Sequence, residues 1–376
     1  MFCVVLLLGA SGPAEAGKVK DIVKRSKIKS SVFLPSSRQV QTQVIRNSVF
    51  FSPLETAITD GPEHNSAIQT TKVDFTFDGW QVLPFEKIKR FDVWLIGYDN
   101  GWKETGSKIS YNLPPGKKTY TLLARAKNKA GEFDNTAAAR TFMVDVSEHW
   151  GKIKIISVVH RGTTAKPHYE KLTLRNQASD LGLNITGWKI KTKRFSFSFE
   201  IPLAARVYNP REPLASDPIV LTKSASVDIY VGKRSPLSVN FQENDCLGYL
   251  RRQFEGYDAV SGGSCPRPDP SSYNHLGLYC REFVPRIGNC ETPQLSPTQF
   301  GGSQYNEKGE PACRDFILRS FNYQACVDRA KNRASFYLAK WKVYLGRTEE
   351  IFDDLDDAVY LYDGQGLLVD TYKYQR

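Results

Sequence analysis

Six cysteines gathered in one stretch of the chain constrain its fold more than any other feature. Cys3 lies near the N-terminus, and the other six fall between positions 246 and 326. An even, clustered set is typical of a disulfide framework, whereas a zinc site would need Cys-x-x-Cys pairs that this stretch lacks. The sequence therefore predicts three disulfides, with free structural thiols and a metal site as the alternatives. The six cysteines are Cys246, Cys265, Cys280, Cys290, Cys313 and Cys326, and the simplest pairing joins nearest neighbours: Cys246 with Cys265, Cys280 with Cys290, and Cys313 with Cys326.

The N-terminus has the features of an export signal. An apolar run from Phe2 to Leu8 is followed by small residues that end in Ala14-Glu15-Ala16, which predicts a signal peptide at 1–16 with cleavage after Ala16. No Lys or Arg precedes this short run, so whether Met1 is the true start stays open. No other stretch approaches the ~20 apolar residues that cross a bilayer, so we expect a secreted or cell-surface protein with no transmembrane span beyond the leader.

Basic residues dominate the segment that follows. The formal net charge is +11, and Lys18 to Arg46 holds eight basic residues against Asp21 alone. Residues 17–52 are therefore predicted to form a basic N-terminal arm or linker. Such an arm attracts polyanions, including nucleic acid and acidic polymers. The alternative is a solvated arm with no ligand.

Composition and periodicity together predict a mainly β protein. The chain has 12% aromatic residues, 20 prolines, 27 glycines and two methionines, which favours short strands joined by turns. Val73, Phe75 and Phe77 alternate with polar residues, and the same alternation recurs from Tyr120 to Ala126. Strands at this spacing indicate an antiparallel β-sandwich.

The segment 53–146 carries a first resemblance. Its phrases PLETAITDGP, FTFDG, LPPGKKTYTLLARAKNKAGEFD and ARTFMV resemble the bacterial immunoglobulin-like or fibronectin type III-like modules of exported proteins. This resemblance implies one sandwich domain over 53–146.

The segment 150–376 carries a second, more specific resemblance. IKIISVVHRG, YEKLTLRN, NITGWKIK, FSFEIPL, WKVYLG and AVYLYDGQGLLVDTYKY follow one another as strand patterns closed by turns. They resemble the lamin-tail domain, an immunoglobulin-like sandwich that also occurs in exported bacterial proteins. The expected fold is thus two immunoglobulin-like β-sandwich domains in tandem. Its core anchors are Trp188, Trp341 and Tyr374, and burying one indole is worth roughly 4–6 kcal/mol before entropy.

The cysteine window departs from this second family. It is expected as a cysteine-rich, partly helical insertion at about 242–334 within the lamin-tail domain. In CRDFILRSFNYQACVDRAKN, Phe316, Ile317 and Phe321 have near-helical spacing, which predicts a short helix pair.

Catalytic and metal-binding motifs are scarce. Asp353, Asp354, Asp356 and Asp357 are interpreted as a solvated turn, with a weak calcium site and paired catalytic carboxylates as alternatives, because the loop lacks Asp-x-Asp-x-Asp-Gly. His160 and His168, with His149 nearby, lack a carboxylate or cysteine at ligand spacing. Gly-x-Ser-x-Gly, His-Glu-x-x-His and a complete phosphate-binding Gly-x-x-x-x-Gly-Lys-Ser/Thr are absent from the sequence. We therefore expect no catalytic residues, no cofactor and no enzyme.

These observations predict an exported, non-enzymatic modular surface protein with an adhesive, scaffolding or protein-interaction role. Its expected partners are other surface proteins or acidic polymers. One alternative is a polyanion or nucleic-acid binder that uses the basic arm, and another is an accessory binding module of a secreted hydrolase. Trp94 and Trp102, around the turn DNGW, are read either as an outward platform that stacks on a sugar or partner or as packing against the neighbouring domain.

Overall fold

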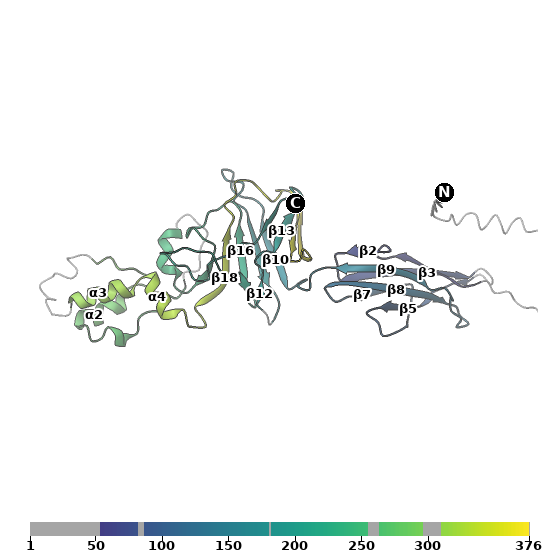
Figure 1. The fold of residues 1–376 in the computed structure, drawn as a ribbon, viewed down its shortest axis with the longest axis horizontal. Helices are drawn as coiled ribbons and strands as arrows, with labels where there is room; N and C mark the ends of the chain where they lie inside the picture. Colours follow the sequence, from purple (N-terminus) through teal and green to yellow (C-terminus); the bar gives the residue numbers. More distant parts are fainter. Residues whose placement is uncertain (1–52, 82–85, 180–181, 255–262, 296–309, 376) are drawn as a thin grey trace, which may run out of the picture. The chain divides into compact units, whose positions relative to one another are not determined.

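The computed structural model of the protein describes residues 53–81, 86–179, 182–254, 263–295 and 310–375. Over these residues the chain is mainly β, with several sheets (Figure 1). The predicted leader at 1–16 and basic arm at 17–52 lie outside the described residues. None of the helices in the described ranges has the length and apolar character needed to cross a bilayer.

Two sheets built by residues 55–145 form the first sheet pair. The first is four-stranded, in the order β1-β3-β4 with β7 also on β3, and the second is five-stranded, in the order β2-β9-β8-β5-β6. All pairings are antiparallel except β2 with β9. The strands are β1 (Glu55–Asp60), β2 (Ser66–Ile68), β3 (Lys72–Gln81), β4 (Glu86–Lys87), β5 (Arg90–Ile96), β6 (Lys103–Thr105), β7 (Lys108–Asn112), β8 (Lys117–Lys127) and β9 (Ala138–Asp145).

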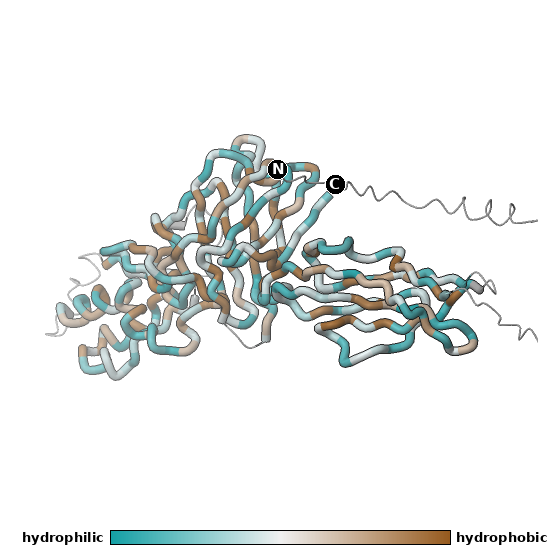
Figure 2. The backbone as a smooth tube through the Cα atoms, turned by 45° about the vertical axis from the view of Figure 1, so that its right-hand side comes forward, coloured by the Kyte–Doolittle hydropathy of each residue, from teal (hydrophilic) through white to brown (hydrophobic). Residues whose placement is uncertain are grey.

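The alternation seen in the sequence places the core of this pair between its two sheets. Val73, Phe75 and Phe77 of β3 are all buried. The Phe75 ring lies 5.7 Å from that of Phe142 on the facing sheet, between ring centroids. Hydrophobic residues recur along the strands (Figure 2), so burial of one strand face joins the two sheets.

Residues 153–375 build the second sheet pair. One sheet is five-stranded, in the order β10-β11-β16-β18-β17, and the other is four-stranded, in the order β14-β13-β19-β20; β12 and β15 form a separate ribbon. The strands are β10 (Ile153–Val159), β11 (Lys171–Asn176), β12 (Leu183–Asn184), β13 (Lys189–Thr192), β14 (Ser198–Glu200), β15 (Val220–Leu221), β16 (Ser226–Tyr230), β17 (Phe241–Asn244), β18 (Tyr337–Tyr344), β19 (Asp356–Tyr362) and β20 (Leu368–Gln375).

The chain leaves this sheet pair after β17 and returns to it at β18. On its return, β18 takes the place between β16 and β17, parallel to β16 and antiparallel to β17. The intervening residues 245–336, here called the cystine segment, carry the helices η1 (Leu247–Phe254), η2 (Pro270–Ser272), α2 (Leu278–Phe283), η3 (Val284–Arg286), α3 (Glu310–Ser320) and α4 (Tyr323–Ala330). The helix pair predicted from the spacing of Phe316 to Phe321 corresponds to α3 and α4.

Two of the three expected anchors lie in the core of the second sheet pair. Trp188 is 5% exposed and Trp341 is 2% exposed, and both belong to the cluster that fills the space between the sheets. Tyr374 is half-buried and packs against that cluster. Its hydroxyl donates a hydrogen bond to the carbonyl oxygen of Asp353 at 2.6 Å, so it closes the loop before β19 as well as covering the core.

A buried carboxylate fixes the segment that leads from β18 to β19. Glu170 is fully buried, and its two oxygens accept hydrogen bonds from the backbone N–H groups of Ile351 (2.9 Å) and Phe352 (3.0 Å). Burial raises the pKa of Glu170 from 4.5 to about 7, although the two N–H groups oppose that effect.

We predict that Glu170 makes the stability of the fold depend on pH. Between pH 4.5 and 7 the folded state keeps a proton that the unfolded state has released, so the free energy of unfolding falls as the pH rises. Compared with Glu170→Gln, the native chain should lose roughly 3 kcal/mol of unfolding free energy as the pH rises from below 4.5 to above 7. Urea unfolding of both proteins across pH 4–8 measures this difference. A constant difference between them over that range would contradict the prediction.

Candidate functional site

Three disulfides organise the cystine segment, and all six clustered cysteines take part. The bonds join Cys246 to Cys326, Cys265 to Cys290, and Cys280 to Cys313. The prediction of three disulfides is thus met, but the nearest-neighbour pairing is wrong for every bond. Neighbours in sequence are separated by the helices of the segment, and packing between those helices decides which sulfurs meet.

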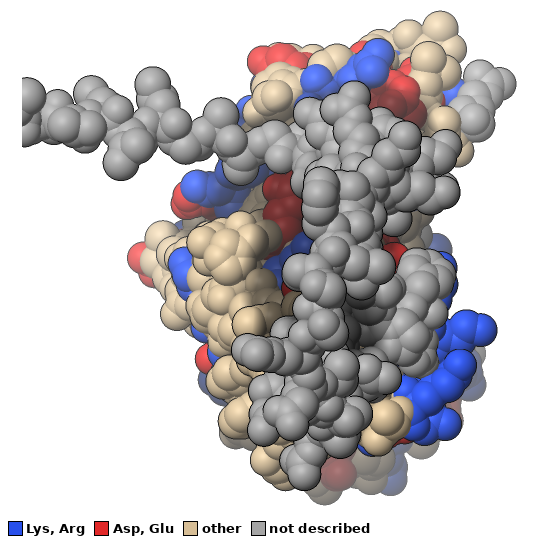
Figure 3. Space-filling model, turned by 90° about the vertical axis from the view of Figure 1, so that its right-hand side faces the viewer, with Lys and Arg blue, Asp and Glu red and all other residues tan. Residues whose placement is uncertain are grey.

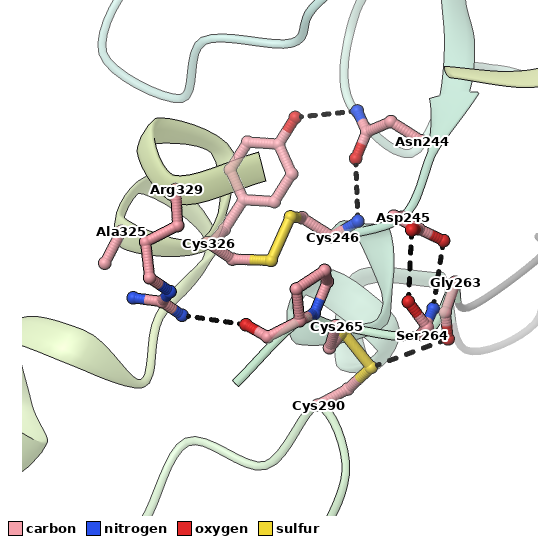
Figure 4. The surroundings of a disulfide bond; sticks show 12 residues. Asn244, Asp245, Cys246, Gly263, Ser264, Cys265, Cys290, Ala325, Cys326 and Arg329 are labelled. Carbon is pink, nitrogen blue, oxygen red and sulfur yellow. Dashed lines mark hydrogen bonds between the residues drawn. A yellow bond between two sulfur atoms is a disulfide. The ribbon is translucent and has the colours of Figure 1, made fainter. Parts of the chain in front are cut away.

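The bond between Cys246 and Cys326 joins the end of β17 to α4 (Figure 4). The side chain of Asn244 contacts the chain on both sides of this bond. Its Oδ1 accepts from the Cys246 N–H at 3.0 Å, and its Nδ2 donates to the hydroxyl of Tyr323 in α4 at 3.2 Å. Asn244 and both cysteines are buried. The sheet edge and the helix that precedes β18 are therefore held together by one covalent bond and a satisfied polar pair.

The bond between Cys265 and Cys290 depends on a close backbone approach. Gly263 has a φ of 67°, and a Cβ there would lie 2.1 Å from the carbonyl oxygen of Asp245, so only glycine fits. The Asp245 carboxylate then accepts two hydrogen bonds from Ser264 (Figure 4). The carbonyl oxygen of Asp245 accepts a hydrogen bond from the Cys265 N–H.

The bond between Cys280 and Cys313 lies in a separate small core. It joins α2 to α3, and both cysteines are fully buried. Ile317 and Phe321, from the predicted helix pair, pack in the same cluster. The cystine segment thus has two hydrophobic clusters, one next to β17 and one around α2 and α3.

A cavity of about 460 Å³ lies where the cystine segment rejoins the second sheet pair. It is lined from the sheet side by Gln242 and Trp341 and from the loop before β15 by Arg206 and Asp217. Tyr337, the first residue of β18, also lines it. A cavity of this size accommodates a small ligand or one residue of a polymer.

The polar groups around this cavity are unevenly satisfied. The Arg206 guanidinium lies 4.3 Å from the centre of the Tyr337 ring, and the Gln242 amide donates to the Leu338 carbonyl at 3.0 Å. Asp217 accepts a hydrogen bond from the Arg206 backbone N–H at 2.9 Å. The indole nitrogen of Trp341 is buried and has no hydrogen-bond partner among the described residues. The cavity therefore offers a cation and an amide beside one carboxylate, while the indole nitrogen of Trp341 is shielded from solvent.

The acidic cluster before β19 forms local hydrogen bonds. Asp353 accepts from the N–H groups of Leu355 and Asp356, which lower its pKa. Asp357 accepts from the N–H groups of Lys193 and Arg194, which ties the end of β13 to β19. In the described part of the chain no three His, Cys, Asp or Glu side chains gather as a metal site would require. Of the weak calcium candidate Asp353, Asp354, Asp356 and Asp357, the first two lie in the loop before β19 and the last two begin β19.

The histidine candidates also lie apart from one another in their contacts. The His160 ring stacks on Tyr374 at 4.4 Å, and the His149 ring stacks on Trp188 at 5.5 Å, both between centroids. His168 packs edge-on against the neighbouring Tyr169. Each ring thus packs against a different aromatic residue.

An aromatic and cationic group lies on the first sheet pair. The rings of Trp94 and Trp102 are 6.0 Å apart, and the Arg125 guanidinium lies 4.3 Å from the Trp102 ring. Trp102 is 36% exposed, whereas Trp94 is half-buried and donates to the Asp99 carbonyl at 3.2 Å. Of the two indoles, Trp102 is the more open to solvent, so the outward-platform alternative is met only in part.

Comparisons with known proteins leave the family open. No family model matches the chain, and no curated protein matches it. Among solved structures, one similar chain is the extracellular domain of a one-component system from B. thetaiotaomicron, at 17% identity and a TM-score of 0.18. The match covers 25% of this chain and 15% of that one, so it bears on neither fold nor function.

Sequence reasoning missed the cavity residues Arg206, Asp217 and Gln242. They are separated along the chain, and Arg206 and Asp217 lie in a loop without strand periodicity. Trp341 was expected only as a core anchor. Its unpartnered indole nitrogen depends on the path of the returning chain, which no local pattern encodes.

We predict that the two clusters of the cystine segment loosen independently. The double variant Cys280→Ser with Cys313→Ser removes a bond between residues with a sequence separation of 33. This should lower the free energy of unfolding by about 4 kcal/mol, because the unfolded chain gains conformational entropy. Hydrogen exchange should then accelerate in α2 and α3 while the amides of β16 and β18 stay protected.

The matched control is Cys246→Ser with Cys326→Ser, which removes the bond next to β17. It should accelerate exchange in β17 and α4 instead. Equal acceleration throughout the segment in both double variants would show that the clusters are one cooperative unit.

Proposed function

We propose that this chain is an exported, non-enzymatic interaction protein built of two immunoglobulin-like sandwiches. In this proposal the second is a lamin-tail domain, and the cystine segment is an insertion in it that borders the binding cavity at Ala334. The observation that supports this proposal is the cavity of about 460 Å³, because the second sheet pair and the cystine segment both border it. The three disulfides support an extracytoplasmic location, since such bonds persist in oxidising compartments.

The chemistry of the cavity favours an acidic sugar of a surface polymer as its ligand. Arg206 can pair a carboxylate, and Asp217 and the Gln242 amide can exchange hydrogen bonds with hydroxyl groups. Tyr337 and Trp341 supply aromatic lining, which suits the apolar face of a sugar ring. A uniformly anionic ligand fits less well because Asp217 would repel it.

Arg206→Ala should weaken binding of a uronate-containing oligosaccharide about tenfold or more, because a charge-assisted hydrogen bond is worth ~1.5–3 kcal/mol. Isothermal titration of the full chain with that probe measures the loss. Arg211→Ala is the matched control, since Arg211 is exposed in the same loop and does not line the cavity.

Equal binding by Arg206→Ala and the native chain would remove the cavity from the proposal. Hydrolysis of the oligosaccharide by the native chain, lost on one substitution, would overturn the non-enzymatic assignment.

A polyanion-binding role is the second candidate, because the sequence places eight basic residues against one acidic between Lys18 and Arg46. In the described part, basic and acidic side chains both reach the surface, and one group of Lys and Arg gathers at the lower right of the face in Figure 3. Deleting residues 17–46 should abolish salt-sensitive retention on DNA if the arm is responsible. Unchanged retention would dismiss the arm.

A further inference from the structure

A buried ion pair links the two parallel strands on either side of the cystine segment. Asp228 of β16 and Lys342 of β18 are direct partners in the strand register. Lys342 Nζ lies 2.7 Å from Asp228 Oδ2, and the side chains are 2% and 6% exposed. Their sequence neighbours Val227 and Trp341 belong to the core between the sheets. The pair therefore lies on the opposite face of the five-stranded sheet.

A third charged side chain, Glu243, belongs to the same cluster and is held there by charge alone. Glu243 of β17 is fully buried, and neither of its carboxylate oxygens has a hydrogen-bond partner among the described residues. Its Oε1 lies 3.7 Å from Lys342 Nζ. A buried carboxylate without hydrogen bonds costs several kcal/mol, so its presence beside an already paired lysine calls for an explanation.

We propose that Lys342 and Asp228 condense to form an intramolecular isopeptide bond, with Glu243 as the proton carrier. The Lys342 nitrogen attacks Cγ of Asp228, an N–C bond forms, and one C–O bond of the carboxyl group breaks. The ammonium group loses two protons in total, and these leave with the departing oxygen as one water molecule. No electrons are transferred and no co-reactant is needed.

The surrounding groups suit each part of this reaction. Thr173 donates its hydroxyl to Asp228 Oδ1 at 2.9 Å, which polarises the carboxyl group and supports negative charge on that oxygen. Lys342 Nζ also donates to the Tyr230 hydroxyl at 3.0 Å, which holds the amine in place. The Lys342 amine and the Asp228 carboxyl group are thus held side by side on adjacent strands. Because their effective concentration is high, the reaction does not require an external activating group.

Proton transfer is the step that needs Glu243. Burial lowers the pKa of Lys342, although Asp228 opposes that effect. Burial also acts to raise the pKa of Asp228, but Lys342, Lys340 and Thr173 outweigh it and the pKa is lowered. The distance of 2.7 Å between Lys342 Nζ and Asp228 Oδ2 is that of an ion pair, and condensation requires the lysine to give up its proton. Glu243 is placed to accept that proton and to return it to the departing oxygen.

Lys340 provides an internal comparison. Its Nζ lies 3.3 Å from the same Asp228 oxygen, but its side chain is 38% exposed. Water competes at such a position for both the amine and the carboxyl group. Lys342, with 2% exposure and Glu243 beside it, is the reacting amine.

An intact-mass measurement on the full chain tests the isopeptide bond. The chain is folded first, and its disulfides are then reduced and its cysteines alkylated. We expect the measured mass to be one water lower than the mass calculated from the sequence, starting at the N-terminal residue found in the same sample. Protease digestion should yield one branched peptide that joins the segments around positions 228 and 342. Lys342→Arg and Glu243→Gln should both have the full calculated mass. Lys340→Arg should still lack one water.

Three results would overturn the inference. One is the full calculated mass for the native chain. Another is loss of water confined to a single unbranched peptide, which indicates cyclisation of an aspartate. The third is an unchanged deficit in Glu243→Gln, which would remove Glu243 from the reaction.

Discussion

The return of β18 into the sheet is the constraint on which the second half of the protein depends. The chain leaves at Asn244 and must re-enter between β16 and β17 at Tyr337. Closing so long a connection costs entropy before any strand contact forms. The bond between Cys246 and Cys326 spans nearly the same interval, with a separation of 80 residues. It therefore reduces the entropy that β18 pairing has to overcome.

This view assigns different tasks to the two kinds of core. The sheet pairs are held by alternating apolar residues such as Phe75 and Trp341, which bury one face of each strand. The cystine segment has smaller clusters, and each contains at least one disulfide. Segments with so little apolar volume generally need covalent bonds to stay folded. With its disulfides in place, the cystine segment can expose side chains to solvent while the second sheet pair holds its two ends.

The sequence predicted the fold more fully than the site. Alternation at Val73 to Phe77 identified a buried strand face, and helical spacing at Phe316 to Phe321 identified a helix pair, because both signals are local. Disulfide pairing followed helix packing, so it could not be read from spacing. The cavity around Arg206 and the cluster of Asp228, Lys342 and Glu243 depend on strand register across the returning chain. Neither has a signature in neighbouring residues.

Disulfide mapping of the full chain tests the central claim most directly. Digestion without reduction, followed by mass spectrometry, should yield linked peptides for Cys246 with Cys326, Cys265 with Cys290, and Cys280 with Cys313. The first of these links the end of β17 to the helix before β18. Recovery of Cys246 linked to Cys265, or as a free thiol, would contradict the account that a covalent bond guides the chain back to its sheet.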